Sequence, residues 1–182
     1  MSAYGPTPSQ TVGPFFAFGL PYSDGPRVVP EWRPDAIRLR GRVTDGEGAP
    51  VPDAMIEIMQ VDAEGRTPRA VGALRRDGAD FSGFGRCDTD PAGRYWFTTL
   101  RPGPVGGAAP YIAMLVFARG LLKPVATRVY FPEEQSANAA DPLLSAVPAD
   151  RRATLVATAE GDGSYRFDIR LQGTGETVFL AV

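Results

Sequence analysis

Apolar residues alternate with arginines in Ile37-Arg38-Leu39-Arg40-Gly41-Arg42-Val43. Because successive side chains of a β-strand point to opposite faces, this period of two predicts a half-buried strand. The turn sequence Asp45-Gly46-Glu47-Gly48 follows directly. The same arrangement, a short apolar run and then turn residues, continues along the chain and sets the expected fold class.

Further strands are expected in eight runs, at 55–61, 81–87, 94–100, 111–118, 126–131, 155–158, 165–171 and 177–182. The run 111–118 is continuously apolar, which predicts a central strand buried on both faces. Asp162-Gly163 suits a type I′ turn and predicts a hairpin between the strands around it. Residues 132–150 suit one or two short helical turns. The pattern therefore predicts an all-β sandwich with one or two short helices.

Residues 1–35 differ from the rest because they hold seven prolines and no hydrophobic periodicity. Such a segment is not expected to form a helix or a central strand. Its large apolar groups still need a surface to lie on, either the chain's own sandwich or another subunit. We therefore predict an N-terminal interface arm at 1–35 and a β-sandwich domain at 36–182.

The composition excludes several functions. A net charge of −2 gives no basic surface for nucleic acid. The sequence holds no apolar run of about 18 residues and begins without a secretory signal pattern, so we expect a cytoplasmic protein without membrane contact. Histidine is absent and Cys87 is the only cysteine. A Ser-His-Asp or Cys-His triad and a zinc site of cysteines or histidines are therefore ruled out.

From the residues alone, functional signals are few. Arg128 and Glu57 are charged residues within apolar strands, where a solvent-facing or ion-paired role is the usual one. The six tyrosines are scattered; they suit amphipathic core or interface positions, although phenolates can also bind ferric iron.

Several motifs, in order along nearly the whole chain, resemble those of the intradiol ring-cleavage dioxygenases. They are 7–16 (TPSQTVGPFF), 83–90 (GFGRCDTD), 93–97 (GRYWF), 101–104 (RPGP), 127–131 (TRVYF), 165–173 (YRFDIRLQG) and 175–179 (GETVF). The C-terminal pair resembles the α subunits of those members that are built from two homologous β-sandwich chains.

The resemblance implies a non-haem Fe(III) enzyme whose β subunit holds the metal through two tyrosines and two histidines. The two tyrosine positions correspond in this chain to Thr67 and Val105, and the two histidine positions correspond to Tyr111 and Ala113. This chain is thus expected to bind no iron and to have no catalytic residue of its own. Its partner is expected to be that β subunit, in a higher-order αβ oligomer.

The resemblance also implies a shared substrate pocket, to which this chain contributes Thr11, Gly13, Pro14, Phe15 and Arg128. The substrates would be O2 and a small aromatic carboxylate, 3,4-dihydroxybenzoate, cleaved to 3-carboxy-cis,cis-muconate. Two alternatives stay open at this point: a self-sufficient intradiol dioxygenase with an unusual ligand set, and a non-enzymatic β-sandwich binding module, since fold alone does not fix function.

Overall fold

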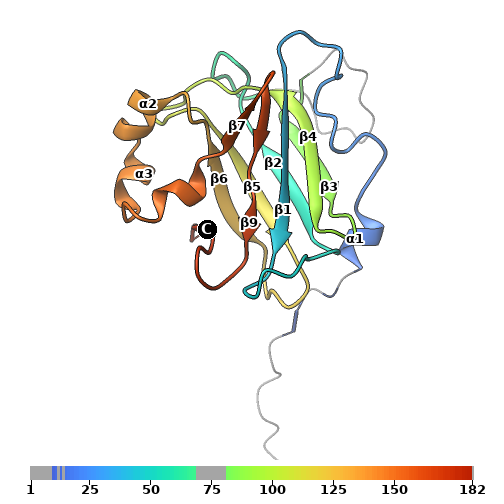
Figure 1. Ribbon diagram of the computed structural model, residues 1–182. Helices are drawn as coiled ribbons and strands as arrows, with labels where there is room; N and C mark the ends of the chain where they lie inside the picture. The colour runs from blue at the N-terminus through green and yellow to red at the C-terminus, as the bar shows by residue number, and fades with distance from the viewer. Residues whose placement is uncertain (1–9, 12, 14, 69–80, 182) are drawn as a thin grey trace, which may run out of the picture.

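The computed structural model describes residues 10, 11, 13, 15–68 and 81–181. Two β-sheets pack face to face (Figure 1). The first sheet has the order β4 (Arg94–Leu100), β1 (Ala36–Thr44), β8 (Ser164–Arg166), β7 (Thr158–Gly161), and β9 (Ile169–Arg170) also pairs with β1. The second sheet has the order β3 (Phe84–Asp88), β2 (Met55–Met59), β5 (Tyr111–Phe117), β6 (Val125–Tyr130). The prediction of an all-β sandwich is confirmed.

Strand β1 is the centre of the first sheet. It pairs antiparallel with β4 and parallel with β8 and β9. Its burial alternates as expected: Leu39 and Val43 are fully buried, whereas Arg40 and Arg42 are exposed. The half-buried strand predicted from the arginine alternation is therefore confirmed.

The core lies between the two sheets and is built from the inward side chains of both. Each such side chain contributes about 1.5 to 3 kcal/mol by leaving water. Its fully buried members include Leu39, Val43, Ile56, Ile58, Phe97, Ile112, Val116, Val129 and Ile169.

Strand β5 lies between β2 and β6, so its central position is as predicted. The prediction that it is buried on both faces was wrong. Ile112 and Met114 point into the core, but Tyr111, Ala113 and Leu115 on the other face are only partly buried. The first sheet covers just one face of the second, which leaves the outer face of β5 accessible.

The same five-residue turn occurs at 45–49, 62–66 and 90–94. In each, the Oδ1 atom of the first residue, an aspartate, accepts the backbone N–H groups two and four residues further on. The fourth residue has a positive φ, which glycine adopts without the steric cost of a Cβ. These residues are Gly48, Gly65 and Gly93, with φ of 87°, 76° and 75°.

Strands β7 and β8 form the predicted hairpin. Asp162 and Gly163 both have positive φ, 49° and 69°, as a type I′ turn requires. The first strand of the hairpin begins at Thr158, whereas the sequence predicted a strand at 155–158. Leu155 instead ends a 3-10 helix, η1 (Arg152–Leu155), because its side chain is buried in a second apolar cluster.

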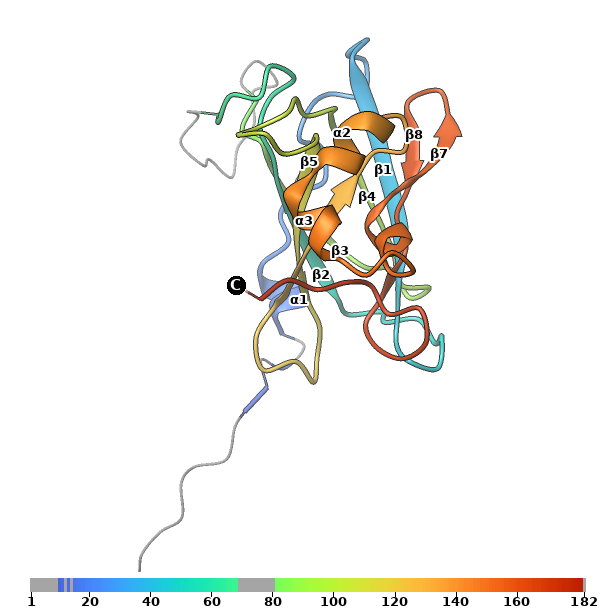
Figure 2. The same cartoon turned by 90° about the vertical axis from the view of Figure 1, so that its left-hand side faces the viewer.

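The two short helices, α2 (Gln135–Ala140) and α3 (Pro142–Ala146), lie side by side at one flank of the sandwich (Figure 2). Leu144 of α3 and Tyr130 of β6 belong to the second cluster. Its buried members are Ala109, Tyr130, Leu144, Val147 and Leu155. The prediction of one or two short helices in 132–150 is confirmed.

Two expectations for the chain ends were wrong. Residues Phe16–Gly19 form a one-turn helix, α1, although the segment was not expected to be helical. Four residues without proline suffice for one turn, and burial of Phe16 against Phe117, with ring centroids 6.2 Å apart, holds it.

The predicted last strand, 177–182, is also absent from its described part, 177–181; Val182 lies outside the described residues. Thr177 bonds to Arg170 of the first sheet, through its backbone N–H and its hydroxyl. Leu180 instead donates to Ala126 of the second sheet. A segment that crosses from one sheet to the other cannot extend the ladder of either.

Candidate functional site

The outer face of the second sheet brings together Arg128 and two of the positions implied to be former iron ligands. Ala113 of β5 pairs directly with Arg128 of β6, and Tyr111 pairs with Tyr130. The guanidinium carbon of Arg128 lies 3.9 Å from the ring centroid of Tyr111. Two antiparallel neighbouring strands thus place a cation over an aromatic face.

Tyr130 is the second aromatic residue that contacts Arg128. Arg128 Nη1 donates to the Tyr130 hydroxyl oxygen at 3.3 Å, and that hydroxyl donates to Asp141 Oδ1 at 3.2 Å. Burial raises the pKa of Tyr130 to about 12, while the hydrogen bond and charge of Arg128 oppose the rise. Tyr130 is therefore a neutral phenol at ordinary pH.

Asp141 is fully buried and fixes this arrangement to the backbone. Its Oδ1 caps α3 by accepting the N–H groups of Leu143 and Leu144, each at 2.9 Å. Its Oδ2 accepts the N–H of Ala109 at 2.9 Å, just before β5. A single carboxylate thus joins α3, the start of β5 and the end of β6, and four donors compensate its burial.

Sequence reasoning missed both Tyr130 and Asp141. A signal for Asp141 was present, because an aspartate before Pro142 is a typical helix N-cap followed by proline at the first helical position. No sequence signal indicated that the same carboxylate also reaches Tyr130.

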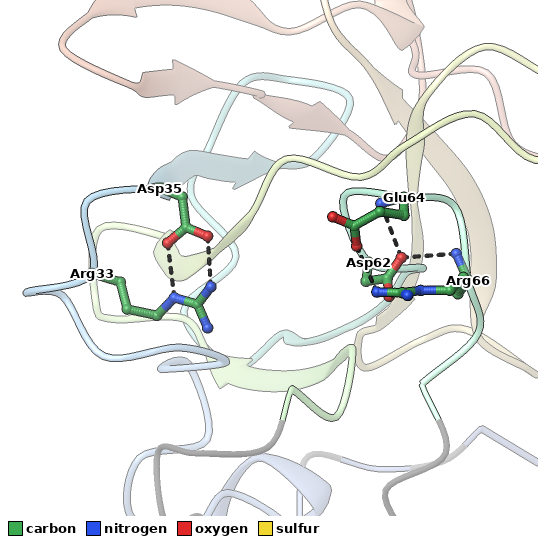
Figure 3. Close-up of polar contacts among 5 residues, drawn as sticks. All are labelled: Arg33, Asp35, Asp62, Glu64 and Arg66. Atoms are coloured by element: carbon green, nitrogen blue, oxygen red, sulfur yellow. Dashed lines mark hydrogen bonds and ion pairs between the residues drawn. The ribbon is translucent and has the colours of Figure 1, made fainter.

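The other two implied ligand positions, Thr67 and Val105, come from adjoining loops. Thr67 follows the turn 62–66, in which Asp62 accepts the backbone N–H groups of Glu64 and Arg66 and the Arg66 guanidinium (Figure 3). These contacts, the Arg66 backbone N–H first, lower the pKa of Asp62. The Asp62 carbonyl in turn accepts the N–H of Gly103 at 2.8 Å, which ties the turn to the loop that leads to Val105.

Arg33 and Asp35, also drawn in Figure 3, form a two-bond ion pair just before β1. The Arg33 hydrogen bond lowers the pKa of Asp35. Their side chains are partly exposed and contact each other, and no contact joins them to Arg128 or Tyr111.

The side chains at the four implied ligand positions do not fit a ferric ion. Thr67, Val105 and Ala113 carry neither phenol nor imidazole, and the remaining phenol, Tyr111, lies under the positive charge of Arg128. A metal cation at Tyr111 would be repelled by that guanidinium. Within 10–11, 13, 15–68 and 81–181, no group of three or more His, Cys, Asp or Glu side chains could hold a metal ion.

The arm candidates lie apart from Arg128 in this chain. Thr11 and Phe15 are exposed and Gly13 is partly exposed, and Pro14 lies outside the described residues. The adjoining Phe16 contacts Phe117, which is four residues along β5 from the Arg128 pairing position, or about 13 Å. The structure therefore does not bring the arm and Arg128 together within one chain.

Glu57 is ion-paired with Arg86, as its place in an apolar strand suggested. Both side chains are mostly buried on the outer face of the second sheet. Arg86 also donates to the Leu20 carbonyl at 2.8 Å and lies over the Tyr22 ring. The pair therefore anchors the arm on the same outer face that carries Arg128.

A groove of about 1060 Å³ lies on the outer face of the first sheet, and Arg128 is not among the residues that line it. Positive and negative side chains line it in nearly equal number, so its charge selects no class of ligand. They are Arg40, Arg42, Arg94, Arg166 and Arg170, with Asp88, Asp90, Glu160 and Asp168.

Comparison with known proteins decides the family. The family model described as "Dioxygenase" matches residues 30–111. The protocatechuate 3,4-dioxygenase alpha chain of Burkholderia cepacia is 43% identical over 97% of this chain and 97% of its own length. This chain belongs to the protocatechuate 3,4-dioxygenase α-chain family. The alpha chain of Pseudomonas putida is 39% identical, over 96% of this chain and 95% of its own.

Other members of the intradiol family are more distant. The protocatechuate 3,4-dioxygenase beta chain of Burkholderia cepacia is 32% identical over 79% of this chain and 67% of its own length. Among solved structures, the dioxygenase domain from Streptomyces sp. SirexAA-E covers 93% of this chain and all of its own, with a TM-score of 0.58 and 22% identity. That structure shares the fold. Membership of the α-chain family confirms the prediction that this chain is a subunit of an intradiol dioxygenase. Such an enzyme uses non-haem iron and includes a β chain.

No helix in the described part of the chain has the length and apolar character needed to cross a membrane.

Proposed function

We propose that this chain is the iron-free α subunit of a protocatechuate 3,4-dioxygenase and completes a substrate pocket around iron held by its β subunit. The holoenzyme would cleave 3,4-dihydroxybenzoate with O2, between the two hydroxylated carbons, to 3-carboxy-cis,cis-muconate. The donor set carries the proposal: three of the four ligand positions have neither the phenol nor the imidazole that the family's ferric site uses, and a guanidinium lies over the ring at the fourth. The expected β chain, with two tyrosines and two histidines, would supply the Fe(III) and its activation of the catechol.

In this proposal Arg128 binds or attracts the substrate carboxylate. Its guanidinium is permanently charged and has several N–H groups besides the one given to Tyr130. An arginine in a partly buried site holds a carboxylate through charge-assisted hydrogen bonds, which also orient the ring.

The arm residues Thr11, Gly13, Pro14 and Phe15 would line the pocket on the partner's side. Phe15 is 83% exposed in the single chain, so its ring is available to cover an aromatic substrate and exclude water. Nothing lies within 4 Å of a Cβ added at Gly13, which fits close approach of another molecule. Assembly into a higher-order αβ oligomer and a cytoplasmic location complete the proposal.

Iron content tests which subunit holds the metal. The chain purified alone should contain no iron and show no ring cleavage, whereas the chain co-expressed with its β chain should contain one iron per αβ pair and be active. Metal analysis and O2 uptake measure both. Stoichiometric iron with activity in the isolated chain would overturn the proposal, and failure of the two chains to associate would favour a separate binding module.

Arg128→Ala in the αβ enzyme should raise KM for 3,4-dihydroxybenzoate by about 10- to 100-fold, because a charge-assisted hydrogen bond contributes about 1.5 to 3 kcal/mol. Arg38→Ala is the matched control, since Arg38 is an exposed arginine on the first sheet. Steady-state O2 uptake measures the effect. Equal KM values for the two variants would show that Arg128 does not contribute to the substrate pocket.

A further inference from the structure

Arg128 lies between two tyrosines that occupy neighbouring strands. The Tyr111 ring supports one face of the guanidinium at 3.9 Å, and the Tyr130 hydroxyl accepts one of its N–H groups at 3.3 Å. The two rings also contact each other, with centroids 6.0 Å apart. Both partners of the cation are therefore tyrosines: Tyr130 follows Arg128 on β6, and Tyr111 lies beside them through the pairing of β5 with β6.

Asp141 determines which way Tyr130 faces Arg128. The Tyr130 hydroxyl gives its single proton to Asp141 and so presents an oxygen lone pair to Arg128. Three backbone N–H groups fix Asp141 itself. The direction of the whole chain of bonds, from guanidinium to phenol to carboxylate, is thus set by buried backbone groups.

Two other partly buried arginines are neutralised directly by carboxylates. Arg86 forms an ion pair with Glu57, and Arg101 pairs with Glu134 at 2.8 Å. Among the described residues, Arg128 forms no ion pair within 4 Å, and the carboxylate of Asp141 reaches it only through a neutral phenol. Its charge is therefore held in place and left available to an anion.

We propose that Tyr111 and Tyr130 are positioning residues that hold Arg128 as an uncompensated cation aimed at the substrate carboxylate. This inference rests on the proposed function and deepens it. An aromatic face attracts a guanidinium without supplying an acceptor that would compete with the substrate. Tyr111 stands where the family pattern implies an iron-binding histidine, so the former metal site now serves to position an organic cation.

The test uses the αβ enzyme and measures Kd in the absence of O2 for two ligands, 3,4-dihydroxybenzoate and catechol, which lacks the carboxylate. Tyr111→Leu should weaken binding of 3,4-dihydroxybenzoate by about 3- to 20-fold, the equivalent of a partly desolvated cation–π contact, and change the catechol Kd less than twofold. Tyr111→Phe keeps the aromatic face and should restore most of the affinity. Tyr130→Phe removes the acceptor of the Arg128 N–H together with the donor to Asp141, and it should produce a smaller loss with the same ligand selectivity.

The Arg128→Ala variant distinguishes a wrong positioning role for the tyrosines from a wrong role for Arg128 itself. If Arg128→Ala weakens binding of 3,4-dihydroxybenzoate and Tyr111→Leu does not, the positioning role is wrong and the proposed function stands. If Tyr111→Leu weakens both ligands equally, Tyr111 only packs the pocket wall, and the inference is again overturned. If Arg128→Ala has no effect on either ligand, both the inference and the role of Arg128 fall. Iron content and αβ assembly equal to those of the wild type ensure that each comparison is made on intact enzyme.

Discussion

Replacing Gly41 by alanine should prevent the chain from accumulating as a folded, soluble protein. A Cβ at this position in β1 would lie 1.8 Å from the Phe167 carbonyl oxygen and 2.8 Å from the Tyr95 hydroxyl. Both neighbours are fixed, because the Tyr95 hydroxyl donates to that same carbonyl and Tyr95 is buried. A close-packed core can only move apart to admit the methyl group, at a cost of about 3 kcal/mol or more.

Soluble yield and the midpoint of urea unfolding measure this effect. Gly19→Ala is the control, since nothing lies within 4 Å of a Cβ added there, and it should behave like the wild type. A Gly41→Ala protein with the wild-type midpoint would mean that β1 and the segment around Phe167 do not approach so closely.

Asp141→Ala is expected to lower the free energy of unfolding by about 3 to 5 kcal/mol, because it leaves several buried donors without an acceptor. These are the N–H groups of Ala109, Leu143 and Leu144 and the hydroxyl of Tyr130. The loss of stability should be greatest in α3 and at its junction with β5 and β6. Chemical unfolding would measure the loss, and amide hydrogen exchange would locate it.

Asp141→Asn is the sharper comparison. Asparagine keeps one oxygen for the N-cap of α3 but places an NH2 group opposite the Ala109 N–H, so it should recover only part of the stability. Recovery of full stability by asparagine would show that the Ala109 bond contributes nothing, and an unchanged Asp141→Ala protein would contradict the capping role altogether.

The sequence by itself determined much of the scaffold. The alternation in β1, the type I′ hairpin at Asp162-Gly163 and the short helices after β6 follow from local patterns, because each depends on side-chain periodicity or on backbone angles that few residues adopt. The absence of histidine and the residues at the four ligand positions also follow from the sequence alone. They led to the hypothesis that any iron is held by a partner chain.

The tertiary structure decided what surrounds Arg128. In the sequence it was one charged residue in an apolar strand, with a solvent-facing or ion-paired role as the ordinary expectation. Tyr130 lies on the same face of β6, two residues from Arg128, but Tyr111 reaches Arg128 through antiparallel pairing of β5 with β6, and Asp141 reaches Tyr130 only through the packing of α3. Register and helix packing depend on the whole core, so no local pattern could specify that Tyr111 and Asp141 meet Arg128 and Tyr130, or that a tyrosine at an implied ligand position would lie against a guanidinium.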